Sequence, residues 1–173
     1  FLQRMRAVPG MAVDRIGTTV QGREISVVRI SSSPTFGEDA SKLRILLFAQ
    51  QHGDEATGKE ALTMLLAQCA SGGMRTILDR CDLLIVPQMN PDGAELGQRR
   101  TADSLDLNRN HAILTTPNTR ALHDLYYRWL PHVTIFRSSR SHALAVRSSS
   151  QASTTARSAG ASGRPWPCRS FPS

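Results

Sequence analysis

The stretch that most constrains the fold is a short apolar segment followed at once by a polar turn, residues 43–58 (LRILLFAQQHGDEATG). The segment from Leu43 to Ala49 is too short for a typical helix and is bounded by polar residues, so we predict a buried strand. A helical pattern begins near Glu55. The sequence therefore predicts that His52 and Glu55 lie together where a strand ends and a helix begins.

An imidazole and a carboxylate at this spacing suit zinc, which takes neutral imidazole nitrogen and carboxylate oxygen as ligands. A catalytic zinc site uses one further protein ligand and leaves a position open for water. His-x-x-Glu alone is a weak signal, because a polar loop with one histidine is usually only hydrated. The choice between these two interpretations therefore depends on the other motifs of the chain.

Strands and helices alternate along the chain. The pattern of a strand occurs at residues 18–20, 24–30, 82–86 and 133–135, and that of a helix at residues 59–69 and 118–130. Three further segments are predicted to be the end of an amphipathic helix (1–13), a helical turn (74–80) and a polar loop (97–110). This alternation predicts an α/β fold with a mixed, largely parallel sheet flanked by helices. Ligands bind beyond the carboxyl ends of such strands, so we expect the His52 loop and the loop starting at Gln88 to meet.

The net charge of +7 is concentrated at one end of the sequence. Residues 136–173 contain six Arg and no acidic residue, so this tail accounts for +6 of the total. The three cysteines do not form a disulfide framework, and we predict that Cys69 and Cys81 are buried free thiols. No apolar run is long enough to span a membrane, and no signal peptide is recognisable, so the sequence assigns no cellular location.

The loop after residue 86 contains a second group of polar residues. NPDG occupies Asn90 to Gly93, and RRTADSLDLNRN occupies Arg99 to Asn110. An arginine fork matches a carboxylate in a bidentate manner, and a second arginine aimed at a carbonyl oxygen would stabilise developing negative charge. The alternative for this loop alone is a hydrated basic segment in which Asn and Asp form turns.

Taken together, four motifs resemble those of the zinc carboxypeptidase family, the carboxypeptidase A-like group: RIGTTVQGREI, HGDE, NPDG and an Arg followed by DLNRN. The motifs occur in the family's order and with its gaps, over about residues 15–135. Four ordered motifs are far more specific than any one of them. The resemblance covers the N-terminal part of the catalytic domain and implies a carboxypeptidase-like, incomplete α/β fold.

The resemblance also implies roles for individual residues. His52 and Glu55 match two zinc ligands, and Asn108 and Arg109 match the pair that holds the C-terminal carboxylate of a peptide substrate. Arg99, rather than the adjacent Arg100, matches the arginine that polarises the scissile carbonyl. The implied reaction is hydrolysis of a C-terminal peptide or related amide bond by water activated by Zn²⁺ and a glutamate.

The family pattern stops after residue 135. A third zinc ligand, a His, is expected there, but Ser138 stands in its place; His132 and His142 are the nearest substitutes. Nothing matches the general-base glutamate. Residues 136–173 form a Ser/Arg/Ala-rich segment that we expect to be disordered or the product of a frame change, beyond a partial catalytic domain at 1–135.

Three functional hypotheses follow. The first is a zinc metallocarboxypeptidase, or an amidase or deacylase relative, truncated and inactive as written. The second is a non-catalytic or vestigial protein that binds carboxylates through Arg99, Asn108 and Arg109. The third is a nucleic-acid binder acting through the Arg-rich tail, but the tail lacks interleaved aromatics, so only nonspecific, salt-sensitive binding is expected.

Overall fold

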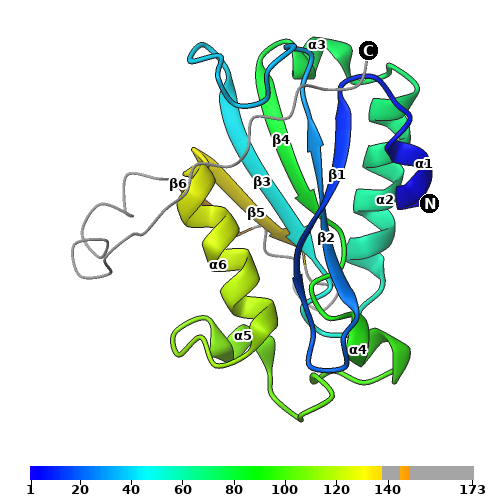
Figure 1. Ribbon diagram of the computed structural model, residues 1–173, viewed down its shortest axis with the longest axis vertical. Coiled ribbons are helices and arrows are strands. Elements are labelled where there is room, and N and C mark those ends of the chain that lie inside the picture. Colours follow the sequence, from blue (N-terminus) through cyan, green and yellow to red (C-terminus); the bar gives the residue numbers. More distant parts are fainter. Residues whose placement is uncertain (138–144, 149–173) are drawn as a thin grey trace.

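The computed structural model describes residues 1–137 and 145–148, which form a six-stranded sheet with helices on both faces (Figure 1). The strands are β1 (Met11–Thr18), β2 (Glu24–Ile30), β3 (Leu43–Ala49), β4 (Cys81–Val86), β5 (Val133–Arg137) and β6 (Ala145–Ser148). The helices are α1 (Leu2–Met5), α2 (Thr57–Ala70), α3 (Arg75–Leu78), α4 (Pro91–Glu95), α5 (Leu107–Asn110) and α6 (Pro117–Trp129). The strand order is β1-β2-β4-β3-β5-β6.

The sheet is mixed, and most of its strands share one direction. β3 is parallel to both β4 and β5, whereas β2 is antiparallel to β1 and β4, and β6 is antiparallel to β5. In the described part of the chain, β1, β3, β4 and β5 therefore run the same way. The predicted mixed, largely parallel α/β sheet is confirmed.

The core lies in two layers because alternate residues of each strand face opposite sides of the sheet. On β4, Leu83 and Ile85 pack in the cluster that includes α2, while Leu84 and Val86 pack in the cluster that includes α6. β4 is buried along its whole length, as expected for a strand covered on both faces. The two covered faces explain why residues 83–86 of β4 form a continuous apolar run.

Both long helices begin and end near the predicted positions. On α2, Leu62, Leu66 and Cys69 are buried against the sheet. On α6, Pro117 occupies the first turn and the Thr116 hydroxyl accepts the Thr119 amide, a side-chain cap of the helix start. The predicted burial of Cys69 and Cys81 as free thiols is also confirmed.

The structure corrects several predictions about irregular segments. The helix expected over residues 1–13 is confined to α1, because residues from Met11 onward pair with β2, in the register Met11 with Ile30. The strand predicted at 18–20 begins much earlier for the same reason. The loops after β4 contain two short helices, α4 and α5, where a turn and a polar loop were expected.

The tail also differs from the expectation in the part that the structure describes. β5 extends through residue 137, and Phe136 stacks on Phe48 with ring centroids 5.1 Å apart. Residues 145–148 form β6 and pair with β5. The rest of the segment predicted to be disordered, including Ser138 and His142, lies outside the described residues. Among the described helices, none combines the length and apolar character needed to cross a membrane.

Candidate metal and substrate site

The carboxyl ends of β3 and β4 point to the same end of the sheet, where α4 and α5 also lie (Figure 1). Hydrogen bonds connect the two loops that leave these strands. The Met89 amide donates to the Ala49 carbonyl, and the Asn90 amide donates to the Gln50 carbonyl, each at 3.0 Å. The expected meeting of the His52 loop with the loop starting at Gln88 is therefore observed.

His52 and Glu55 face each other in this loop. The His52 Nδ1 atom lies 3.1 Å from the Glu55 Oε1 atom, and the two side chains are each 4% exposed. The backbone makes a tight turn between them, in which the Glu55 amide donates to the His52 carbonyl at 3.1 Å. The loop thus holds the two side chains together before α2 begins, as their spacing in the sequence predicts.

Asp106 approaches the other nitrogen of the same imidazole. Its Oδ1 atom lies 3.1 Å from His52 Nε2, and it also accepts the Asn108 amide at 2.9 Å as the N-cap of α5. A neutral imidazole carries one ring proton. With that proton on Nε2, donated to Asp106, Nδ1 presents a lone pair beside Glu55. This is how metal-binding histidines are usually oriented by a carboxylate.

The electrostatics of the site favour an ionised Asp106. Partial burial alone would raise the pKa of Asp106, but hydrogen bonds from His52 and from the Asn108 amide, with the charges of His52 and Arg99, lower this pKa below its usual value. A carboxylate that is ionised at neutral pH can accept the Nε2 proton and hold the ring in a fixed orientation.

Arg99 bridges the two carboxylates of the site. One terminal nitrogen lies 3.3 Å from Glu55 Oε1, and the other lies 3.4 Å from Asp106 Oδ2. Its side chain is 38% exposed, so the guanidinium also reaches solvent. Arg100 is oriented differently and donates to the Ser104 carbonyl at 3.0 Å. Of the two adjacent arginines, the structure brings Arg99 to the His52 loop.

Asn108 and Arg109 lie on α5, the short helix that Asp106 caps. Both side chains are exposed. Because the capping residue contacts the His52 ring, this helix begins within hydrogen-bond distance of the loop. Arg109 is therefore on the same side of the molecule as His52.

The described residues offer two suitable donors for zinc. Two ligands at 2.0–2.2 Å from a tetrahedral zinc are about 3.4 Å apart, close to the 3.1 Å between His52 Nδ1 and Glu55 Oε1. No cluster of three His, Cys, Asp or Glu able to hold a metal ion is found within residues 1–137 and 145–148. The pair fits part of a zinc site, and no third ligand is found within those ranges.

His132 does not supply the third ligand. Its Nδ1 atom accepts the Arg44 amide at 2.9 Å, and it lies immediately before β5. Since β5 is parallel to β3, His132 is at the amino end of the sheet, whereas His52 follows the carboxyl end. Ser138 and His142, the other positions considered, lie outside the described residues.

Sequence reasoning missed two residues of the site. The sequence predicts only a loop position for Asp106, although this residue lies in the same DLNRN motif as Asn108 and Arg109. The NPDG motif predicts only a turn position for Asn90, but Asn90 is fully buried and its side chain donates to backbone carbonyls of both site loops. The signal available for both was their position within motifs that already carried predicted site residues.

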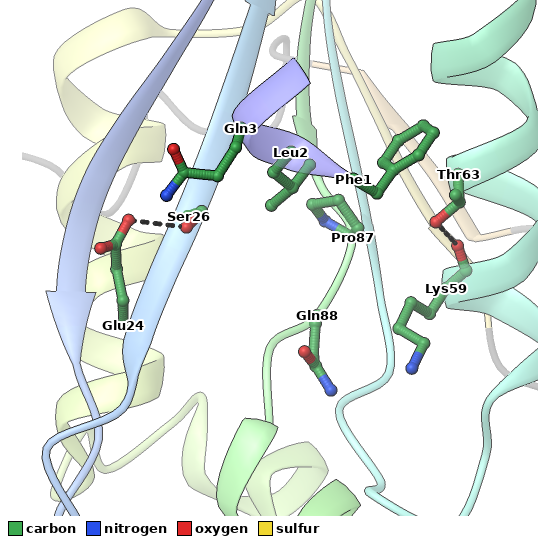
Figure 2. Close-up of a pocket in the computed structure, with 9 residues that line it drawn as sticks. All are labelled: Phe1, Leu2, Gln3, Glu24, Ser26, Lys59, Thr63, Pro87 and Gln88. Carbon is green, nitrogen blue, oxygen red and sulfur yellow. Dashed lines mark hydrogen bonds between the residues drawn. The ribbon is translucent and has the colours of Figure 1, made fainter. Parts of the chain in front are cut away.

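A separate cavity of about 460 Å³ lies between α1, β2, α2 and the end of β4 (Figure 2). It is lined by Phe1, Leu2, Gln3, Glu24, Ser26, Lys59, Thr63, Pro87 and Gln88. In Figure 2 the aromatic, leucine and proline side chains form one end, and the Gln88 and Lys59 side chains project at the other. None of the predicted site residues lines it, so the cavity is distinct from the His52 loop.

Comparison with known proteins identifies the group to which this arrangement is similar. A profile of the family described as zinc carboxypeptidase matches residues 1–154. Carboxypeptidase 2 of Trichophyton rubrum is 32% identical over 139 residues, which are 77% of this chain and 26% of that protein. The chain thus spans about a quarter of that relative's length. The family match extends beyond residue 135, where the sequence motifs stopped.

Solved structures give the same result. A metallo-carboxypeptidase from Burkholderia cenocepacia superposes with a TM-score of 0.71 at 26% identity, covering 78% of this chain and 38% of that one. A metallo-carboxypeptidase from Pseudomonas aeruginosa, solved with (2-guanidinoethylmercapto)succinic acid, has a TM-score of 0.67 at 29% identity, with 78% and 36% covered. The described sheet therefore matches part of a larger domain in these structures.

Proposed function

Because the chain belongs to the zinc carboxypeptidase family, we propose that its site serves hydrolysis of the C-terminal peptide bond, or a related amide bond, of a substrate with a free carboxylate. In this proposal, His52 and Glu55 are zinc ligands and Arg99 contacts the scissile carbonyl. Asn108 and Arg109 bind the substrate's terminal carboxylate.

The observation that carries the proposal is the environment of the His52 ring. One nitrogen faces a carboxylate that can share a metal with it, and the other faces a carboxylate that can fix the ring's proton and orientation. A hydrated surface histidine would not be 4% exposed between two carboxylates. The zinc interpretation of the motif is therefore favoured over the hydrated-loop interpretation.

The residues of the chain would divide the work as follows. A bound zinc ion would lower the pKa of a water molecule and polarise the carbonyl of the substrate. Asp106 holds the His52 ring, which keeps Nδ1 directed at the metal position. Arg99 stands beside Glu55 with part of its guanidinium exposed, and can donate to a carbonyl oxygen as negative charge develops there.

The two residues on α5 suit recognition of a carboxylate. Arginine presents two parallel N–H donors to a carboxylate, and an asparagine amide can add a third. Both side chains are exposed on a helix that begins at the site. Such contacts select substrates by a free C-terminus rather than by their internal sequence.

Zinc binding tests the metal part of the proposal. We expect His52→Ala to abolish stoichiometric zinc binding, measured by elemental analysis and chelator competition, and Glu55→Gln to weaken it at least tenfold. Glu60→Gln, at an exposed position in α2, is the matched control for Glu55→Gln and should bind as the parent does. Equal zinc content in all four proteins would contradict the assignment of these ligands.

Ligand binding and hydrolysis test the substrate part. The compound bound by the Pseudomonas relative, (2-guanidinoethylmercapto)succinic acid, is a suitable carboxylate probe. Arg109→Ala should weaken its binding by about ten- to a hundredfold, the value of a lost charge-assisted pair, whereas Arg100→Ala should not. Hydrolysis of peptides with free but not blocked C-termini would support an enzyme; carboxylate binding without turnover would support a non-catalytic relative.

A further inference from the structure

Asn90 connects the loop that carries His52 to the segment that carries Arg99. It is fully buried, and its side-chain amide donates to the Gln51 carbonyl at 3.2 Å and to the Arg99 carbonyl at 3.4 Å. Gln51 is the residue directly before His52. One amide group therefore lies between the backbone next to the predicted metal ligand and the backbone of the predicted carbonyl-binding arginine.

The other atoms of Asn90 are also used. Its side-chain Oδ1 atom accepts the Gly93 backbone amide at 2.9 Å as the N-cap of α4, and the backbone amide of Asn90 donates to the Gln50 carbonyl. Only an amide side chain of this length both donates and accepts in this way. An aspartate would keep the acceptor for Gly93 but would lose both donated hydrogen bonds.

The surrounding backbone is closely packed around this side chain. The Gly53 amide donates to the same Arg99 carbonyl at 3.2 Å. A Cβ atom at Gly53 would lie 2.0 Å from the Gly93 carbonyl carbon, so the two loops are in direct backbone contact. A change in the position of one loop must therefore move the other.

From these contacts we propose that Asn90 is a positioning residue that sets the separation between the metal ligand His52 and Arg99, an inference that rests on the proposed function of this site. The individual hydrogen bonds are ordinary in strength, but a displacement of about 1 Å in a reacting group can reduce a rate by about a hundredfold. Among the hydrogen bonds of the described residues, none joins the Asn90 side chain to the side chain of His52 or Arg99. Asn90 would therefore act through the backbone of the two segments.

The test compares Asn90→Asp with Asn118→Asp in the complete chain. Asn118 is also buried and donates through its side-chain amide to a backbone carbonyl, that of Met89 at 2.8 Å in the loop after β4. It lies on α6, and its side chain bonds neither to the His52 loop nor to Arg99, so it does not link the two as Asn90 does. Both substitutions replace a buried amide by an acid of the same size. Any difference between them at the site therefore reports the connection that Asn90 makes.

Two measurements are made well below the unfolding temperature: hydrogen exchange of the Gly53 amide, normalised to that of Ile85 in β4, and the dissociation constant for Zn²⁺ from chelator competition. We expect Asn90→Asp to speed the normalised Gly53 exchange and to weaken zinc binding, each at least tenfold. Asn118→Asp should change both less than twofold, even if it lowers the unfolding temperature as much.

The inference is overturned if the two variants alter Gly53 exchange and zinc affinity equally, because Asn90 would then be one more buried structural amide. If Asn90→Asp does not fold, Asn90→Ser, which keeps a cap acceptor but cannot reach both carbonyls, takes its place. A parent protein that binds no zinc would contradict the proposed function, and the Gly53 exchange would still decide whether Asn90 holds the two loops together.

Discussion

We predict that the half-buried His111 lowers the free energy of unfolding of this protein in acid. Its Nδ1 atom lies 3.1 Å from Nε2 of His123, and its Nε2 atom lies 2.7 Å from Oε1 of Gln51. Burial, with the nearby charge of His123 when protonated, lowers the pKa of His111 from 6.5 to about 4. The folded protein therefore keeps His111 neutral over a range in which the unfolded chain protonates it.

The sign and size of the effect follow from proton linkage. A histidine with a depressed folded pKa stabilises the fold fully above its unfolded pKa of 6.5, and this contribution is lost as the pH falls towards the folded value of about 4. For these two values, the free energy of unfolding should fall by up to about 2.5 kcal/mol between pH 7.5 and pH 4.5. The pKa of His123 is lowered too, chiefly by burial, which adds to the effect.

The assay is urea unfolding of the parent and of His111→Gln at several values between pH 7.5 and pH 4.5. The parent also contains carboxylates that titrate in acid, so the informative quantity is the difference in unfolding free energy between the two proteins. We expect His111→Gln to be the less stable protein at pH 7.5 and to lose about 2 kcal/mol less on acidification. A difference that is constant across this range would refute the reasoning.

Three further predictions concern the site loops and the core. Gly53→Ala should destabilise the fold by about 3 kcal/mol or more, seen as a lower thermal midpoint, because its Cβ would lie 2.0 Å from the backbone of Gly93; an unchanged midpoint would exclude that close contact. Asp106→Asn should weaken zinc binding about ten- to a hundredfold in chelator competition, because it alters the partner that orients His52; unaltered affinity would show that Asp106 does not orient the ring. Cys69 should react slowly with a thiol reagent in the folded protein, because burial raises its pKa; a rate equal to that in urea would contradict its burial.

The sequence predicted those parts of the fold that have a regular hydrophobic period. The apolar runs of β3 and β4 indicated buried strands, and the helical spacing of apolar residues on α2 and α6 indicated two helices that pack on the sheet. Their alternation was sufficient to predict a largely parallel sheet, because parallel strands need a connection of this length between them. The positions of the His52 loop and the loop after β4 at one edge followed from that topology.

Segments without such a period could not be predicted in the same way. β1 pairs with β2 from Met11 onward, and no local feature distinguishes its first residues from the end of a helix. α5 has only four residues, and its start depends on the Asp106 side chain that caps it. Short helices gain little from propensity alone, so their formation depends on contacts elsewhere in the fold.

By itself, the sequence determined the pairing of His52 with Glu55, because both lie within one turn of chain between a strand and a helix. It also determined the family, through four motifs in order. Only the tertiary structure decided that Arg99 lies between Glu55 and Asp106, that Asp106 holds the His52 ring across 54 residues of sequence, and that Asn90 lies between the two loops. Such contacts depend on how separate loops pack at the end of a sheet, and hydrogen bonds between distant residues leave no periodic trace in a single sequence.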